Sequence, residues 1–410
     1  MITECINSRL LKWSALLAAG LMVQAMAGAA EVKRKLNPKH ADTFLISYLS
    51  FADDEHYEKR RAYAGVTLKQ QTRPLNGVTL GIRAARITGR SLGVRFELAE
   101  HQLDPEQDYV AEAVEWLLQN QSGAAILDLP KKVTIEIAAA LGGKPVILFN
   151  PRHRDNDLRG MQCFGQLFHT IPSHAMLMDA LNQYLKSRNW SKVLMLTGPT
   201  EDDASLSLAY RQSAKKFAIR VVSDNPFVLG NDPRDRNKTN ISLLTGRPKH
   251  DIVFVADSLG EFARYVPYQT YYSRLVIGSE GLQADAWHWA WERHGAPQLN
   301  QRFSRKFDTR MSAEQWAGWA AVKALTSAAR MAKSIEYSEL MAALSSQDLI
   351  LDLYKGAPGN FRAWNNQLRQ PILLRTHNAV VSRAPLEGFL HHRNTLDTLG
   401  IDELESDCVW

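Results

Sequence analysis

Short, nearly uninterrupted apolar segments alternate with helical segments from residue 42 onward, and this order limits the chain to few folds. Strands that are apolar along their whole length are typical of parallel sheets covered on both faces. The expected strands are residues 43–50, 94–99, 124–129, 145–149, 192–197, 220–224, 251–256 and 275–278. The sequence therefore predicts an α/β fold made of doubly wound, Rossmann-like units.

Helical patterns fill the intervals between these strands. Asp104-Pro105 and Pro172-Ser173 are helix start signals, because an N-cap residue or a proline favours the first turn. The expected helices are residues 58–75, 78–88, 105–120, 133–141, 173–188, 205–217, 259–265, 287–307 and 313–333. Residues 361–375 alternate like a terminal hairpin.

Three interruptions of this rhythm, at residues 150–157, 279–286 and 356–359, indicate crossings between two lobes. A chain of 410 residues exceeds the roughly 250 to 300 residues that one core supports. We therefore expect two lobes joined by a three-crossing hinge. The boundaries expected are a signal peptide at 1–30, a first lobe of 31–150 plus 283–355, a second lobe of 151–282 plus 356–385, and a C-terminal tail of 386–410.

The first thirty residues have the three parts of a secretory signal. Arg9 and Lys12 precede an apolar run at 13–23, and small residues follow at 25–30. The apolar run is too short for the ~20 residues that span a bilayer, although a retained N-terminal anchor is the alternative. The sequence predicts export to the periplasm and a mature chain that is not embedded in the membrane.

Charge and motifs exclude several function classes. The formal net charge of +6 is spread along the chain without a basic block, which argues against a nucleic-acid partner. His-Glu-x-x-His, Walker, Cys-x-x-Cys and dinucleotide-binding motifs are all absent from the sequence. We expect a protein that is not an enzyme, without catalytic residues and without a cofactor. A hydrolase or a periplasmic dehydrogenase subunit is the rival class.

Two cysteines, Cys163 and Cys408, remain after the signal, since Cys5 precedes its apolar core. In an oxidising compartment they form either one disulfide or two buried free thiols.

Several motifs resemble those of the type I periplasmic solute-binding proteins of ABC importers, in the branched-chain amino acid class. They are Gly-x-x-Leu-Gly-Ile at 77–82, Asp104-Pro105, Gly-Ser-Glu-Gly at 278–281 and the long helix at 316–333. The resemblance implies a monomer that closes on a small ligand and partners with a permease and an ATPase. A sensor or accessory protein with the same fold is the alternative.

Four further runs resemble the subgroup associated with PQQ-dependent alcohol oxidation, which implies a ligand linked to that metabolism. They are residues 150–159, 168–173, 287–294 and 361–371.

Ligands of open α/β sheets bind beyond the carboxyl ends of the strands, so the residues that follow each strand are the candidates. The candidate ligand-binding residues are Ser50, Phe51, Asp53, Asp128, Asn150, Arg152, Asp202, Asp257, Glu280 and Trp289. Glu280 matches the family glutamate that binds a ligand ammonium group. The loop at 127–131 lacks the family's serines and contains Asp128, which disfavours an amino-acid ligand.

Two ligand classes fit these candidates. A metal ion or other cation suits the carboxylates, with Asp54 and Asp203 as further ligands. A neutral alcohol or aldehyde suits hydrogen bonds and stacking on Phe51, Trp287 or Trp289. Against both, Asp, Ser and Asn are common as helix caps and in loops.

Two other groups have structural interpretations. Arg152, Arg154 and Arg159, interleaved with Asp155 and Asp157, indicate an ion-pair network in the hinge. Trp287 and Trp291 share a face of the expected helix and belong to the core, which leaves Trp289 at the cleft rim.

Overall fold

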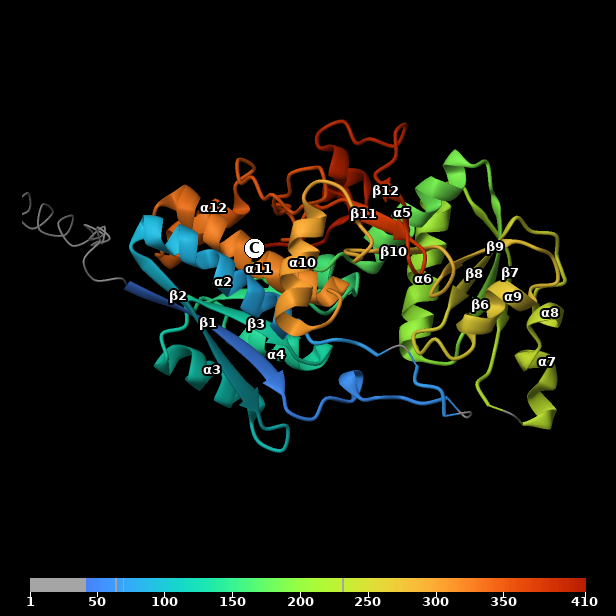
Figure 1. Ribbon diagram of the computed structural model, residues 1–410, viewed down its shortest axis with the longest axis horizontal. Helices are drawn as coiled ribbons and strands as arrows, with labels where there is room; N and C mark the ends of the chain where they lie inside the picture. Colours follow the sequence, from blue (N-terminus) through green and yellow to red (C-terminus); the bar gives the residue numbers. More distant parts are fainter. Residues whose placement is uncertain (1–41, 63–64, 69, 231) are drawn as a thin grey trace, which may run out of the picture.

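The computed structural model describes residues 42–62, 65–68, 70–230 and 232–410 (Figure 1). The expected signal peptide at 1–30 lies outside the described residues. Two parallel sheets at opposite ends of the molecule and a small antiparallel sheet between them organise the chain. No helix of the described part is both long and apolar enough to cross a bilayer.

The first sheet has the strand order β2-β1-β3-β4-β5 and all its pairs are parallel. Its strands are β1 (Asp42–Phe51), β2 (Val94–Leu103), β3 (Ala124–Asp128), β4 (Ile147–Asn150) and β5 (Leu167–His169). Successive residues of β3 point to opposite faces: Ile126 belongs to one core cluster and Leu127 to another. Burial on both faces explains why these strands are apolar throughout.

Helices cover both faces of this sheet. On one face α2 (Leu75–Leu92) and α11 (Ala313–Ala332) lie side by side, and on the other are α3 (Tyr109–Gln119) and α4 (Lys131–Ala140). Helices α10 (Ala296–Phe307) and α12 (Tyr337–Ser345) pack at the α2–α11 side.

The second sheet has the order β7-β6-β8-β9, again all parallel. Its strands are β6 (Lys192–Thr197), β7 (Arg220–Pro226), β8 (Ile252–Ala256) and β9 (Leu275–Gly278). Helices α5 (His174–Ser187) and α6 (Glu201–Lys216) cover one face. The other face packs against the short helices α8 (Ile241–Leu244) and α9 (Val266–Gln269), with α7 (Arg236–Thr239) beside them. All eight expected strands are confirmed within one or two residues, apart from β2, which continues to Leu103.

The third sheet joins the two lobes. Strands β10 (Gln283–Asp285), β11 (Ile372–Arg375) and β12 (Val380–Ala384) pair antiparallel. Ile372 and Leu374 pack in the core of the second lobe, whereas Leu373 packs in the core of the first. Within the expected hairpin at 361–375, Phe361 and Leu368 form one antiparallel bridge, and the hairpin of regular strands follows at 372–384.

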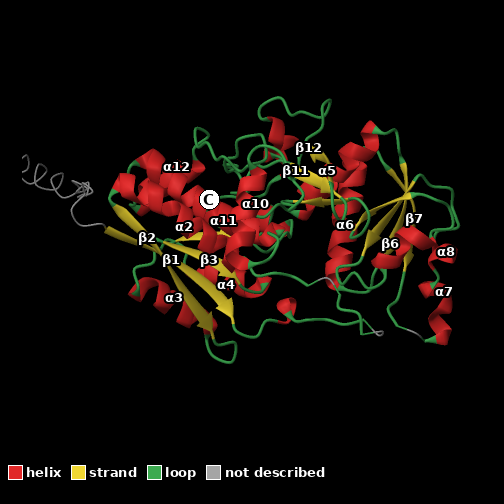
Figure 2. Cartoon of the chain, viewed as in Figure 1, coloured by secondary structure: helices red, strands yellow, loops and turns green. Residues whose placement is uncertain are grey.

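The first change of sheet comes later in the chain than expected. Strand β5 pairs with β4, so residues 167–169 belong to the first sheet, and the chain enters the second lobe only at α5. The expected boundary at residue 150 is thus wrong by about twenty residues, because a three-residue strand carries too little pattern to be seen. Figure 2 shows the loops that connect the lobes in green.

Two helix predictions fail for a local reason. The described residues between 58 and 74 are not helical: Arg61 pairs with Thr67 in an antiparallel bridge, and α2 starts only after Pro74. Residues 287–295 are irregular, because Gly295 has a φ of 80° and Pro297 stands in the first turn of α10. Helix α3 begins after Asp108, which accepts a hydrogen bond from the Ala111 N–H, and not at Asp104-Pro105.

Six short 3-10 segments complete the described elements. They are η1 (Glu55–Tyr57), η2 (Asp157–Arg159), η3 (Pro233–Asp235), η4 (Ala263–Tyr265), η5 (Thr395–Thr398) and η6 (Glu403–Glu405). The expected helix at 259–265 thus appears only as η4 followed by α9.

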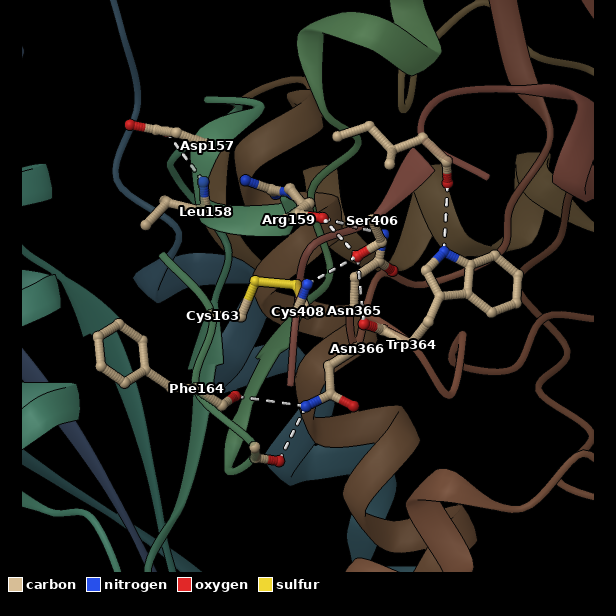
Figure 3. Close-up of a disulfide and its surroundings, with 12 residues drawn as sticks. Asp157, Leu158, Arg159, Cys163, Phe164, Trp364, Asn365, Asn366, Ser406 and Cys408 are labelled. Atoms are coloured by element: carbon tan, nitrogen blue, oxygen red, sulfur yellow. Dashed lines mark hydrogen bonds between the residues drawn. A yellow bond between two sulfur atoms is a disulfide. The ribbon is translucent and has the colours of Figure 1, made fainter. Parts of the chain in front are cut away.

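The C-terminal tail contacts both lobes, and Figure 3 shows its disulfide. In this tail the backbone N–H of Gly400 donates a hydrogen bond to the carboxylate of Asp179 on α5 at 2.8 Å. Further on, the N–H of Asp407 donates to the carbonyl of Gly160, and Cys408 forms a disulfide with Cys163. The alternative of two free thiols is therefore wrong.

Candidate functional site

The carboxyl end of β3 carries a buried polar cluster centred on Asp128. The side chain of Asp128 is inaccessible to solvent and accepts hydrogen bonds from the phenol of Tyr48 at 2.5 Å and from Tyr57. Arg73 Nη1 donates to the same carboxylate at 3.0 Å, and Arg152 Nη1 lies 3.5 Å from it. Four donors from four segments therefore share one carboxylate.

Tyr57 lies between two guanidinium groups. The Arg73 guanidinium carbon is 4.4 Å from the centre of the Tyr57 ring, and that of Arg152 is 5.1 Å away. Cations over an aromatic face are attracted by its negative quadrupole. Arg73 also donates to the carbonyl of Phe51 at 2.8 Å, which ties the segment before α2 to the end of β1.

Burial sets the protonation states in this cluster. Burial and the neighbouring Asp128 charge raise the pKa of Tyr48 well above its usual value, and the same two causes raise the pKa of Tyr57. Both phenols therefore remain donors. Burial raises the pKa of Asp54, but the hydrogen bond and charge of Arg152 outweigh it, so that this pKa is lowered overall.

The predicted ion-pair network in the hinge exists with different partners. Arg152 binds Asp54 at 2.6 Å, and Arg154 binds Glu314 at 2.8 Å. Asp155 and Asp157 instead both bind Lys131, at 3.1 and 2.6 Å. Figure 3 shows Arg159 beside the disulfide, where its Nε donates to Gln367.

Asn150 and His153 shape the turn that follows β4. The Asn150 side chain is fully buried, accepts from the N–H groups of Arg152 and His153, and donates to the His153 carbonyl. Its amide nitrogen also lies 3.0 Å from Nδ1 of His169 on β5, so the side chain ties the turn to the neighbouring strand. Asn150 thus positions Arg152.

In the second lobe the candidate acids that form hydrogen bonds accept them mainly from N–H groups of their own loops. Asp257 accepts from the N–H groups of Gly260, Phe262 and Ala263, so its carboxylate caps the turn after β8. Burial raises its pKa. Asp202 is exposed in the first turn of α6.

Glu280 is half-buried after β9 and accepts from the N–H of Gly281. Hydroxyl groups lie near the carboxyl ends of β6 and β8: Thr200 and Ser258 are within 3.0 Å of each other. Ser279 accepts from the N–H of Asp257 at 2.9 Å.

The remaining candidates differ in accessibility. Ser50 and Phe51 are both only 6% exposed, and Phe51 packs edge-on against Tyr109. Asp53 is exposed. Trp289 is half-buried, with the Arg310 guanidinium 3.6 Å above its ring, whereas Trp287 and Trp291 belong to the core as expected.

Sequence reasoning missed Tyr48, Tyr57 and Arg73. Tyr57 lies just before, and Arg73 near the end of, the segment 58–75, for which the sequence predicts a helix. Tyr48 is followed by three residues of the apolar strand β1, where it resembles a core side chain. The available signal was the position of Tyr48 near the carboxyl end of an expected strand. Asp128 stands at the same end of a neighbouring strand.

The arrangement does not assemble a site for a multivalent cation. Among the described residues, no three His, Cys, Asp or Glu side chains gather closely enough to hold a metal ion. Asp54, Asp128 and Asp257 already accept from protein donors. Hard cations need several free oxygen ligands, which these carboxylates do not offer.

No family model matches the sequence, and no curated protein does. Solved structures do match over most of the chain. A periplasmic binding protein from Burkholderia mallei is 13% identical with a TM-score of 0.63, and the match covers 90% of this chain and 99% of that one. A branched-chain amino acid ABC transporter periplasmic ligand-binding protein from Burkholderia xenovorans is 13% identical with a TM-score of 0.65, covering 83% and 95%.

A leucine-, isoleucine-, valine-, threonine- and alanine-binding protein from Brucella ovis is 11% identical with a TM-score of 0.65, covering 82% and 90%. The chain has the type I periplasmic binding protein fold. The predicted fold class is thereby confirmed. In a type I fold the Asp128 cluster occupies the edge of the first lobe where ligands of open α/β sheets bind.

Proposed function

We propose that this chain is the periplasmic solute-binding component of an ABC importer. It captures a small ligand between its lobes and delivers it to an inner-membrane permease that works with an ATPase, without chemistry on the ligand. The observation that carries the proposal is a buried hydrogen-bonding cluster, Tyr48, Tyr57, Arg73 and Asp128, at the carboxyl edge of the first sheet of a type I fold.

The hydrogen-bonding groups of the cluster favour a ligand that offers oxygen acceptors. Arg73 is the most accessible charged side chain here, with 27% of its side chain exposed, and its charge is shared with a buried aspartate. Arg73 and Arg152 compensate Asp128, so repulsion of a ligand carboxylate is weaker than the sequence suggested. The ligand is therefore an alcohol, an aldehyde or a carboxylic acid, and not a metal ion.

The connection to PQQ-dependent alcohol metabolism is part of the proposal and rests on the four sequence runs alone. Among the structural neighbours, a Rhodopseudomonas palustris solute-binding protein was solved in complex with benzoate. An aromatic or short-chain acid is accordingly included among the candidate ligands.

A thermal-shift screen of the mature protein tests the proposal. A ligand that binds only the folded state raises the unfolding midpoint by mass action. We expect a hit among alcohols, aldehydes or acids that is lost in Arg73→Gln and retained in the exposed control Arg95→Gln, whose side chain is 67% exposed. Small-angle scattering should show compaction with the hit, since closure requires tighter binding to the closed form.

Three outcomes would count against it. They are no hit in any class, a hit without compaction, and turnover of an alcohol or an ester. A hit with compaction from a protein whose gene lies beside a sensor kinase, and away from permease genes, would favour the alternative of a sensor.

A further inference from the structure

A cavity of about 80 Å³ lies on the outer side of the first lobe, between α2, α11 and α10. Its wall on α2 consists of small side chains, among them Ala84 and Ala85. Trp319 and Lys323 of α11 line the opposite side, and Arg302 and Tyr354 close one end.

The packing of α2 against α11 explains why the space is empty. A Cβ added at Gly77 would lie 1.6 Å from the Gln315 carbonyl oxygen, and one at Gly81 would lie 2.8 Å from the Val322 Cβ. The two helices thus nearly touch along the first two turns of α2. Beyond this close approach, the small side chains of α2 do not fill the distance to Lys323.

The cavity carries positive charge without a carboxylate in contact. The Lys323 side chain makes no hydrogen bond or ion pair within the described residues. Burial lowers its pKa, and the nearby charges of Arg330 and Arg302 lower it further, while Asp352 raises it. Arg302 donates only to the neutral carbonyl of Gln298 and the phenol of Tyr354, at 3.2 and 3.1 Å.

Lys323 is partly buried and Arg302 is exposed at one end of the cavity. Cations that lack a counter-ion attract anions, more strongly where the local dielectric is lower than that of water. We propose that this cavity binds a small oxyanion, phosphate or a short carboxylate, between the Lys323 ammonium and the Arg302 guanidinium. Tyr354 and the buried ring of Trp319 form its wall. The cavity is large enough for an ion of this size.

The cavity is separate from the Asp128 cluster. Arg73 lies just before the first turn of α2, whereas the cavity residues of that helix run from Gly81 to Thr88, six to thirteen residues after Leu75. At 1.5 Å per residue they lie about 9 to 20 Å along the helix. None of the residues that line the cavity belongs to the Asp128 cluster.

Titration with sodium phosphate and with sodium acetate, at constant ionic strength set with sodium chloride, tests the inference. The unfolding midpoint of the mature protein should rise saturably with at least one of the two anions. Lys323→Gln should weaken this apparent affinity at least tenfold. Lys306→Gln removes the same charge from an exposed site on α10 that does not line the cavity, and should leave the affinity unchanged.

A steric variant separates the cavity from a general charge effect. Ala84 is exposed at the rim, so Ala84→Leu folds and places a larger side chain in the space while Lys323 stays. We expect it to abolish the saturable shift. Equal midpoint shifts in all four proteins, or no saturable shift in the wild type, would overturn the inference.

Discussion

Asp397 holds two buried arginines in place, and its replacement gives the sharpest test of how the C-terminal tail is fixed. Its Oδ1 accepts from Arg362 Nε at 2.9 Å and from Arg369 Nε at 2.7 Å, and its Oδ2 accepts from Arg369 Nη2 at 2.9 Å. The three side chains are 3%, 1% and 4% exposed. Asp397→Asn keeps the size of the side chain and removes a carboxylate that, among the described residues, alone contacts both guanidiniums.

The magnitude follows from burial. Removing one partner of a buried ion pair costs about 3 to 5 kcal/mol, because an uncompensated charge remains inside. The other donors of Arg362 bind neutral carbonyls, including Leu399 at 2.6 Å, and these do not replace a carboxylate. With a urea m-value of about 3 kcal/mol per M, the midpoint should fall by roughly 1 to 1.7 M.

Urea unfolding followed by circular dichroism measures this change. The matched control is Glu403→Gln on the same tail, whose partner Arg393 is 69% exposed and which is itself 52% exposed. Exposed pairs contribute less than about 1 kcal/mol, so the control should stay close to the wild type. If Asp397→Asn is as stable as Glu403→Gln, water or rearrangement compensates the arginines and the reasoning is wrong.

Three further predictions concern other parts of the molecule. The disulfide closes a loop with a sequence separation of 245, for which loop entropy predicts a stabilisation of up to about 5 kcal/mol. A reductant should lower the urea midpoint of the wild type and leave that of the double variant Cys163→Ser/Cys408→Ser unchanged. An equal effect of the reductant on both proteins would contradict this. Burial and the Arg154 charge lower the pKa of His174 to about 4, so its contribution to stability is complete above about pH 6.5 and is lost as the pH falls through 4, at about 1.4 kcal/mol per pKa unit. Thermal midpoints between pH 7 and 4 should therefore fall less steeply in His174→Gln than in the wild type or in the exposed His392→Gln, and parallel curves would refute the assignment. Gly77→Ala should destabilise the protein by about 1 to 3 kcal/mol or more, because its Cβ would overlap the Gln315 carbonyl, whereas Gly246→Ala, with no neighbour closer than 3.4 Å, should be tolerated in the same urea assay.

The sequence predicted the two parallel sheets because their strands are buried on both faces and are continuously apolar. Strands β5 and β10 have three residues each, and such short segments show no period. They exist because a neighbouring strand offers hydrogen-bonding partners, which is tertiary information. The error at the first lobe boundary follows directly from missing β5.

The sequence predicted the positions of the candidate site residues better than their hydrogen-bonding partners. Asp128 and Arg152 follow strands and lie together at one edge of the first sheet, as expected. Tyr57 and Arg73 reach Asp128 from a connection without regular periodicity, and only the folded chain brings them there. The sequence left open whether Asp257 and Asn150 bind a ligand or cap their own turns, because residue type alone could not decide between these two roles.

The bond between Cys163 and Cys408 has a consequence for how the protein is made. The ring that it closes contains every strand of the second sheet and of the third. Synthesis proceeds from the N-terminus, so the ring cannot close until Cys408 has emerged, when all these strands are already available to pair. The strands must therefore pair before the disulfide forms. In a chain that lacks Cys408, non-covalent contacts alone would hold the C-terminal tail against the segment around Cys163.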